Sequence, residues 1–215
     1  MEEKINPFEK AGKVLVVIGI LDILFMVYAI SNQMSYSSSF NIFSVIAGIF
    51  LIKGGVKTAR VVRWFSAFCV IAFTAMYILM PFSTPFELTV TQFKLNPLGM
   101  SLSYLIGIVF IIVLAWVYKQ LSTEASLAVL KEAGYNTGKP KSAAYISAFL
   151  IVLGGIFTGM FLTGESAIKA EELARAEHGS EYKYRISSLS TSGNKGSAVV
   201  TAYNSNEIKN VRVSW

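Results

Sequence analysis

The sequence has little charge and few of the side chains that carry chemistry. Only 15% of its 215 residues are charged, and it contains one cysteine, one histidine and one aspartate. A soluble domain carries about 25% charged residues. Cys69 has no second thiol with which to form a disulfide, and we expect it to be a small buried apolar residue. Because no catalytic triad, metal-ligand cluster or phosphate loop can be assembled, we expect no enzyme activity, no metal and no other cofactor.

Long apolar runs take the place of the missing charge. Four runs of 17 to 22 residues cover Val14–Ile30, Val61–Phe82, Leu98–Tyr118 and Ala143–Leu162, which is the length of a membrane-spanning helix. A fifth run, Phe40–Ile52, is short for a crossing and reaches a spanning length only when it is extended back to Met34. On length alone, this fifth run is a crossing, a re-entrant segment or a buried helix.

The placement of Lys and Arg favours the crossing. Segments 1–13, 31–39, 53–63, 83–97 and 119–142 contain 3, 0, 4, 1 and 4 basic residues. Basic residues favour cytoplasmic loops, so this alternation predicts five crossings, a cytoplasmic N-terminus and an extracytoplasmic C-terminus. Trp64 and Trp116 then fall at cytoplasmic interfaces, where indole rings prefer to lie. There is no Lys/Arg-rich tract, so we expect no binding to nucleic acid.

The C-terminal residues change character completely. Glu165–His178 is rich in strong helix formers and is followed by Gly179, which predicts a helix that stops there. Three runs with strand-like alternation follow, at Tyr182–Leu189, Ser197–Tyr203 and Ile208–Trp215. The predicted fold is therefore a five-helix transmembrane domain, residues 1–162, and a small extracytoplasmic α+β domain, residues 163–215, in which a helix packs on a three-stranded antiparallel meander.

The end of this domain resembles the tail of cytochrome oxidase assembly factor 1-like domains. The resemblance lies in the order helix, strand, Gly193–Gly196 turn, strand Ala198–Ala202 and a last strand ending in Trp215. It implies a membrane-anchored helix-plus-meander domain and covers at most 50 residues, and that family usually has a single span. The chain is also similar to uncharacterised multi-pass proteins of Gram-negative bacteria, which implies an inner-membrane location but no activity.

Segment 119–142 is the longest stretch predicted to be cytoplasmic. The sequence from Ser122 begins like a helix, and Gly134 suits its end. Leu127, Leu130 and Ala133 would share one face, which predicts a short helix along the membrane surface. Such a helix is either a connector or a partner-docking element, and its shortness favours the connector.

Asp22 is the one acidic residue inside a predicted span. A carboxylate near mid-membrane costs about 2.5–3.5 kcal/mol on insertion scales, so we expect it to face other helices and to be paired or protonated. Its candidate partners are Lys53 and Arg63, or the hydroxyl groups of Ser44, Ser66, Thr74 and Tyr104. Asp22 is therefore either a polar clamp between helices or a proton- or ion-responsive site, and the absence of internal repeats favours the clamp.

Two further features are expected to be structural. Ser147, Gly155 and Gly159 form a stripe of small residues on the last predicted span. Such stripes permit close helix packing, either within the chain or with a second copy. His178 stands at a predicted helix end without a ligand cluster, so we expect a surface or structural histidine.

Taken together, these features favour a non-catalytic accessory or interaction protein of the bacterial inner membrane. Its spans would lie in the lipid bilayer, and its periplasmic domain would bind a membrane-protein or envelope partner. About 50 residues make a marginal isolated core, so this domain is expected to lean on a partner, on lipid or on another copy. The alternative is a small proton- or ion-coupled transporter that uses Asp22.

Overall fold

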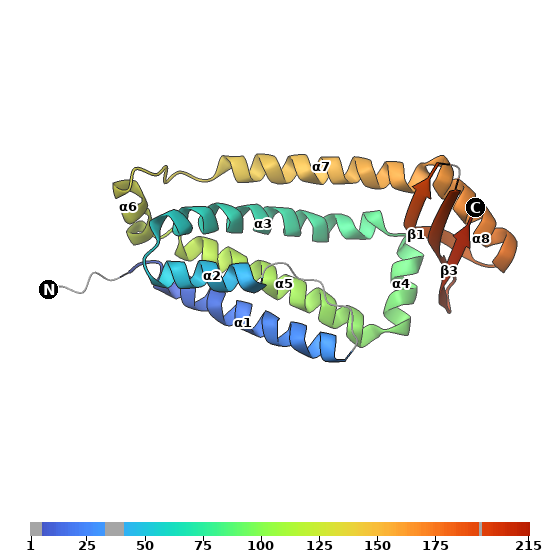
Figure 1. Cartoon of the computed structure of the whole chain (residues 1–215), viewed down its shortest axis with the longest axis horizontal. Helices are drawn as coiled ribbons and strands as arrows, with labels where there is room; N and C mark the ends of the chain where they lie inside the picture. The colour runs from blue at the N-terminus through green and yellow to red at the C-terminus, as the bar shows by residue number, and fades with distance from the viewer. Residues whose placement is uncertain (1–5, 33–40, 194) are drawn as a thin grey trace. The chain divides into compact units, whose positions relative to one another are not determined.

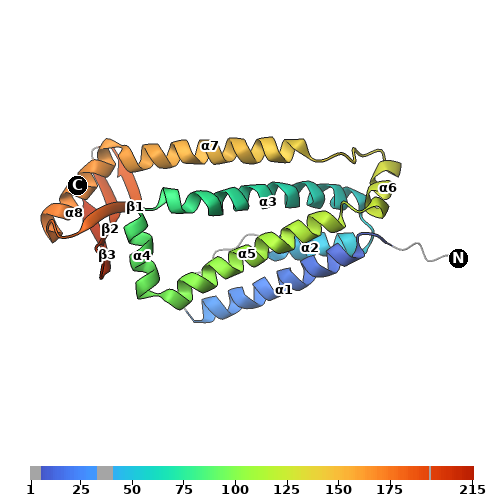
Figure 2. The same cartoon turned by 180° about the vertical axis from the view of Figure 1, so that it is seen from behind.

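The computed structural model describes residues 6–32, 41–193 and 195–215 of the chain. These residues form two compact units, one from residues up to 71 together with 110–147, and one from 72–109 together with 148–215. Figures 1 and 2 show the elements from opposite sides. The helices are α1 (Glu9–Ser31), α2 (Asn41–Ile52), α3 (Val56–Ser83), α4 (Phe86–Leu95), α5 (Pro97–Gln120), α6 (Glu124–Glu132), α7 (Lys141–Thr163) and α8 (Glu165–His178), and the strands are β1 (Lys183–Ser192), β2 (Lys195–Tyr203) and β3 (Ile208–Ser214).

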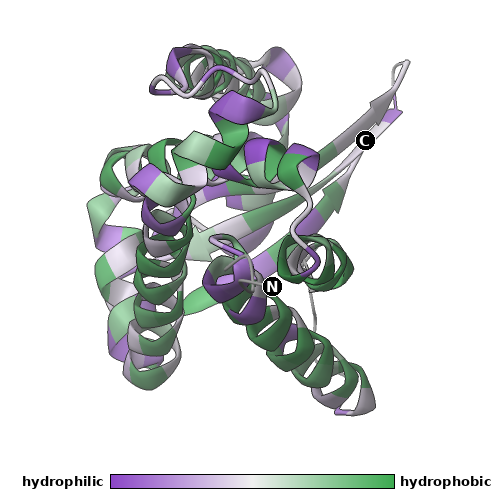
Figure 3. Cartoon of the chain, turned by 90° about the vertical axis from the view of Figure 1, so that its left-hand side faces the viewer, coloured by the Kyte–Doolittle hydropathy of each residue, from purple (hydrophilic) through white to green (hydrophobic). Residues whose placement is uncertain are grey.

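Four of the described helices, α1, α3, α5 and α7, are long and apolar enough to cross a membrane. They contain the four long runs predicted from the sequence. The apolar side chains of these helices are largely exposed, as at Leu24, Val152 and Phe157. The same is true of Phe43 on the shorter helix α2. Figure 3 shows hydrophobic residues along most of these helices. Such a surface is unfavourable in water and suits contact with hydrocarbon.

The predicted count of five membrane-length helices is not confirmed. The fifth run forms α2, which has 12 residues and a length of about 18 Å at 1.5 Å per residue. That is shorter than the roughly 30 Å hydrocarbon core. The extension from Met34 that would lengthen the run falls mostly at 33–40, outside the described residues.

Helices α1 and α2 nevertheless form an antiparallel pair, side by side in Figure 1. Asn6, ahead of α1, donates from Nδ2 to the carbonyls of Leu51 (2.9 Å) and Ile52 (2.8 Å) at the end of α2. Its Oδ1 accepts from the Phe8 backbone N–H at 3.0 Å, immediately before α1 begins. One side chain therefore satisfies the start of α1 and the end of α2, and α2 returns the chain to the end where α1 begins.

A close glycine contact allows this pairing. A Cβ atom on Gly12 would lie 2.7 Å from the carbonyl oxygen of Gly48, and one on Gly48 would lie 2.6 Å from the carbonyl oxygen of Gly12. Backbone atoms cannot move aside as a flexible side chain can. The two helices therefore touch backbone to backbone, as small-residue contacts permit in membranes.

The same unit has a buried apolar cluster. It is formed by the start of α1 and α3, the ends of α2 and α5, and α6, through Phe8, Ala11, Leu15, Leu51, Ala59, Val117, Leu121 and Leu130. Helix α6 matches the predicted short helix: Thr123 caps it by accepting from the Ser126 N–H, and Gly134 follows with φ +79°. Leu130 is fully buried in the cluster, and Leu127 packs against it. This burial gives α6 a structural role at the end of the helices.

The predicted C-terminal helix and antiparallel meander are confirmed. Helix α8 spans the predicted residues and ends before Gly179, whose φ is +86°. The sheet order is β1-β2-β3 with both pairs antiparallel, and a register shift falls between Ile186 and Ser188. Alternate side chains on one sheet face meet Ala167, Ala170 and Ala174 of α8. Alanine at these positions lets the helix lie close to the sheet.

Helix α4 was not predicted. Segment 83–97 was expected to be a plain connection, yet α4 forms between Pro85 and Asn96 and buries Leu88 and Thr91. Thr91 Oγ1 donates to the carbonyl of Asn204 at 2.8 Å, and Lys183 forms an ion pair with Glu87. The helix is short, and its polar contacts are with residues about 100 positions away, so the local sequence pattern did not predict it.

Replacing Gly12 by Ala is expected to destabilise the α1–α2 pair. The new methyl group would press on the backbone of residues 48 and 52, and overpacking of this kind costs about 1–3 kcal/mol. Thermal unfolding of the full chain in mild detergent should show a lower midpoint. The matched control is Gly154→Ala, where a Cβ meets nothing within 4 Å among the described residues. Equal midpoints for the two variants would contradict the close contact.

Glu171 on α8 gives a pH-dependent prediction. Burial raises the pKa of Glu171 above its ordinary value of 4.5, although Arg175 and a hydrogen bond from the Ile186 backbone oppose the shift. The folded state therefore holds the proton more tightly than the unfolded state does, so this group costs stability as pH rises through that raised pKa. Glu171→Gln should raise the calorimetric midpoint of the full chain relative to the native chain at pH 7, and the difference should vanish below pH 4.5. Exposed Glu172→Gln is the control, and a constant difference across pH would count against the assignment.

Candidate functional site

Arg63 is the most unusual charged residue among those described. It lies on the first third of α3 and is only 6% exposed. Its Nε donates to Ser122 Oγ at 2.9 Å, and its Nη2 donates to the carbonyls of Thr137 (3.1 Å) and Gly138 (3.0 Å). The Tyr118 ring lies 5.8 Å from the guanidinium carbon. A buried charge is thus held by uncharged oxygens and an aromatic face.

The loop between α6 and α7 is shaped to supply these carbonyls. Gly134 ends α6 with a positive φ, and Asn136 Oδ1 accepts from the Gly138 N–H at 2.8 Å, which closes a tight turn. Pro140 follows, and α7 begins at Lys141. Arg63 therefore ties α3 to this loop and to Ser122, the residue that follows α5 by two positions.

Trp64 makes a second tie beside Arg63. Its Nε1–H donates to Ser142 Oγ at 2.9 Å, which links α3 to the first turn of α7. Its ring stacks on Phe68 with centroids 5.7 Å apart. Five residues further along α7, Ser147 Oγ donates to the Phe68 carbonyl at 3.1 Å. These contacts fix the start of α7 against α3.

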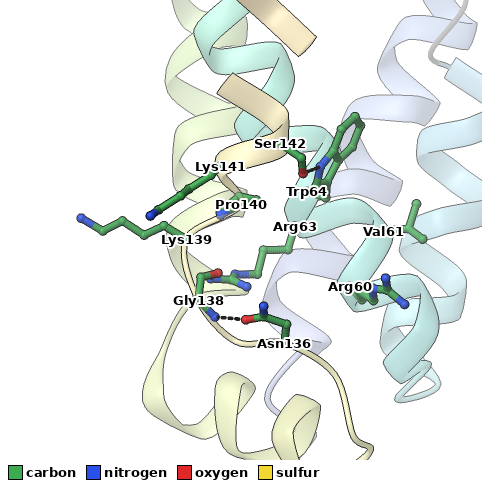
Figure 4. Close-up of a pocket in the computed structure, with 10 residues that line it drawn as sticks. All are labelled: Arg60, Val61, Arg63, Trp64, Asn136, Gly138, Lys139, Pro140, Lys141 and Ser142. Carbon is green, nitrogen blue, oxygen red and sulfur yellow. Dashed lines mark hydrogen bonds between the residues drawn. The ribbon is translucent and has the colours of Figure 1, made fainter. Parts of the chain in front are cut away.

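A cavity of about 910 Å³ opens at this junction. Figure 4 shows the residues around it, with Arg63 beside Gly138 and with Lys139 and Lys141 extending to the same side. The lining residues come from α3, the α6–α7 loop and the start of α7: Arg60, Val61, Arg63, Trp64, Asn136, Gly138, Lys139, Pro140, Lys141 and Ser142.

The electrostatics of this cavity have one sign. Four of the lining residues, Arg60, Arg63, Lys139 and Lys141, are cationic, and none is acidic. Within the part of the chain that the structure describes, ion pairs form at Lys13, Lys183 and Lys209, and none involves these four cations. Arg60 lies over the Tyr135 ring at 4.9 Å. The site is thus suited to attract an anion.

A second, apolar groove of about 670 Å³ shares the wall residue Val61 with this cavity. Its lining is drawn from α1, α2, α3 and α5 and is almost entirely apolar, including Leu15, Ile18, Phe43, Ile46, Phe50, Phe65 and Phe110. Lys57 lies in the same lining, one turn before Arg60 and Val61 on α3. A cationic chamber and an apolar groove thus meet at one residue.

Two of the predicted partners of Asp22, Arg63 and Lys53, are placed near other groups, and the partner of Asp22 stays a prediction. The Arg63 guanidinium donates hydrogen bonds to Ser122 and to two carbonyls of the α6–α7 loop. Lys53 follows the end of α2, beside Asn6, whereas Asp22 lies near the middle of α1, about 20 Å further along the helix. Asp22 is half-buried and makes an interaction within the protein, and it lines neither of the two cavities described.

The predicted stripe of small residues divides in two. Ser147 is fully buried and bonded to α3, as described above. A Cβ on Gly155 or Gly159 would meet nothing within 4 Å among the described residues. His178 is exposed at the end of α8. No group of three or more His, Cys, Asp or Glu side chains placed to hold a metal occurs in the described ranges.

Sequence reasoning found Arg63 but assigned it a different role. The other three cations of the cavity, Arg60, Lys139 and Lys141, entered only as topology signals. Their convergence depends on α7 packing beside α3, a contact between residues more than 75 positions apart, which no local pattern encodes. The sequence feature that could have indicated this site is that two basic segments, 53–63 and 119–142, are predicted on the same side of the membrane, each next to a span.

Arg63→Ala is expected to loosen the α6–α7 loop. It would leave Ser122 and the carbonyls of Thr137 and Gly138 without their donors, and hydrogen bonds to a charged group contribute about 1.5–3 kcal/mol each. The unfolding midpoint in detergent should fall, and amide exchange over residues 134–140 should accelerate. Arg60→Ala is the control, since an exposed cation–π contact contributes about 0.5–1 kcal/mol. Equal losses in both variants would refute the structural role of Arg63.

Comparison with known proteins gave no match: no protein-family model, no curated protein and no solved structure corresponds to this chain. The resemblance of the C-terminal domain to cytochrome oxidase assembly factor 1-like domains therefore stays a prediction from the sequence. Function is inferred below from the geometry of the described residues.

Proposed function

We propose that this chain is a non-catalytic accessory protein of a bacterial inner membrane, and that it presents its C-terminal domain, residues 163–215, to a membrane-protein or envelope partner. The observation that carries the proposal is an open strand edge on a folded domain that continues directly from a membrane-length helix.

The domain is joined closely to the apolar helices. Only Gly164 separates α7 from α8, so the folded domain begins where the apolar helix ends. Helix α4, which lies between α3 and α5, contacts the sheet through the Lys183–Glu87 ion pair and the Thr91 hydrogen bond to Asn204. Arg185 also donates to the carbonyl of Ser83 at the end of α3. These ties support a domain held at the membrane surface.

The outer edge of β3 is the surface suited to a partner. Gly196 and Trp215 exchange both backbone hydrogen bonds, at 2.7 and 2.9 Å, which fixes the ladder between β2 and β3. By antiparallel alternation, the backbone groups of Asn210, Arg212 and Ser214 then point away from β2. Their side chains are exposed. An edge of this kind can accept an extended segment of a partner as a fourth strand.

The proposed orientation places the N-terminus in the cytoplasm and the C-terminal domain in the periplasm. The alternating basic counts support it, as does the antiparallel return of α2 beside α1. In this proposal α2, together with the residues before it, completes a fifth crossing. Transport through Asp22, the alternative function, has no comparable support, because neither described cavity is lined by Asp22.

Photo-crosslinking in cells tests the proposed edge. A photoreactive residue at Ser214 should give one discrete adduct, whereas the same group at Lys195, on the hairpin, should not. Arg212→Pro should abolish the adduct, because proline removes an outward N–H while leaving the β2–β3 hydrogen bonds in place.

Arg212→Ala is the matched control and should keep the adduct. Circular dichroism of the purified chain checks that the proline variant keeps its fold. An adduct that survives Arg212→Pro, or equal crosslinking from Ser214 and Lys195, would contradict partner binding along β3.

A further inference from the structure

The uncompensated charge of Arg63 requires an explanation. Burying a guanidinium is expensive unless it is paired or fully hydrogen-bonded. Its Nε and Nη2 are satisfied by oxygens of the protein, and no carboxylate lies within 4.0 Å of it among the described residues. Its Nη1 has no protein acceptor there, and because no buried side-chain nitrogen in the described residues lacks a partner, Nη1 has accessible surface. Arg63 lines the cationic cavity, so an anion that enters can accept a hydrogen bond from Nη1 and balance the charge of the guanidinium.

The cavity adds further positive charge around that position. Lys139 and Lys141 flank Pro140 at the start of α7, and both are exposed at the cavity wall. Arg60 lies one turn before Arg63 on α3. Guanidinium and ammonium groups on two sides of a chamber are the donors that phosphate oxygens select, with arginine supplying a planar fork and lysine a mobile charge.

The apolar groove distinguishes a lipid from a free anion. A soluble phosphate would need the cavity alone. Here the groove shares Val61, which is 57% exposed, with the cavity, and its lining from α1, α2, α3 and α5 includes exposed Phe43 and Phe50. A ligand that fills both spaces has a charged head and an apolar tail. The Trp64 ring beside the cavity is a residue type that favours the headgroup level of a bilayer.

We propose that this junction binds an anionic phospholipid. Its phosphate lies against Arg63 and is surrounded by Arg60, Lys139 and Lys141, while one acyl chain follows the groove past Val61 and Phe65. Basic pockets between membrane helices on the cytoplasmic side bind anionic headgroups in this way. The site goes beyond the proposed function, since it lies in the other compact unit and does not depend on the β3 edge.

Native mass spectrometry of the full chain in mild detergent tests the site with phosphatidylglycerol as the probe. The double variant Lys139→Gln/Lys141→Gln should bind phosphatidylglycerol about tenfold or more weakly, since each basic residue near an anionic headgroup contributes on the order of a fivefold gain. Lys169→Gln/Lys195→Gln, which removes two charges from the C-terminal domain, should bind as the native chain does. Equal affinity of the two double variants would overturn the proposal.

A groove variant separates lipid from free phosphate. Ala47 lines the groove, and Ala47→Phe should occupy the space of the acyl chain. We expect it to weaken phosphatidylglycerol binding while inorganic phosphate competes poorly with the lipid on the native chain. If Ala47→Phe binds the lipid normally and inorganic phosphate displaces it at equal concentration, the site takes a free anion and the lipid assignment is wrong.

Headgroup charge gives the last arm of the test. Phosphatidylcholine has the same phosphodiester and similar acyl chains but no net charge. It should bind the native chain more weakly than phosphatidylglycerol and should be unaffected by Lys139→Gln/Lys141→Gln. Equal binding of the two lipids would show that the cations do not select the ligand. Arg63→Lys, which keeps the charge but loses the planar fork, should fall between the native chain and the lysine double variant.

Discussion

The apolar surface of α1, α3, α5 and α7 is the constraint on which the rest of this structure depends. These helices expose most of their large hydrophobic side chains, and the buried clusters lie near helix ends and in the C-terminal domain. In water that exposure would be a large free-energy cost, whereas in hydrocarbon it costs nothing. Once these helices lie in a bilayer, polar groups must gather where helices begin and end. The Arg63 junction and the C-terminal domain are both polar assemblies at such ends.

The Arg63 junction shows how this constraint shapes a site. A buried guanidinium with no carboxylate partner among the described residues is held by Ser122 and two loop carbonyls, and four cations share one cavity wall. A soluble protein would more commonly pair such charges with acids. At a membrane surface the lipid itself supplies the counter-charge, and the structure then does not need to carry it. The same reasoning explains why an apolar groove meets the cavity at Val61.

Much of the fold was predictable because residues close together in the sequence determine it. Helix α8 matches its predicted bounds, since its composition, cap glycine and following alternation agree. The four long helices followed from run length. Other features were not local. Helix α4 bonds to Asn204 and Lys183, the Gly12–Gly48 contact joins positions 36 apart, and the cavity cations meet only because the start of α7 bonds to α3. The contacts of Arg63 were not local either, because Ser122 and the α6–α7 loop lie 59 to 75 positions away from it in the sequence.

The central claim is that the chain crosses the membrane an odd number of times, with short α2 completing one crossing. Cysteine labelling tests it most directly. In a Cys69→Ser background, single cysteines replace Lys10, which precedes the apolar part of α1, and Ser205, in the turn between β2 and β3. A membrane-impermeant maleimide should label Ser205→Cys from the periplasmic side in cells with a permeable outer membrane, and it should label Lys10→Cys only after the inner membrane is opened. Labelling of both positions from the same side would mean an even number of crossings and would contradict the account.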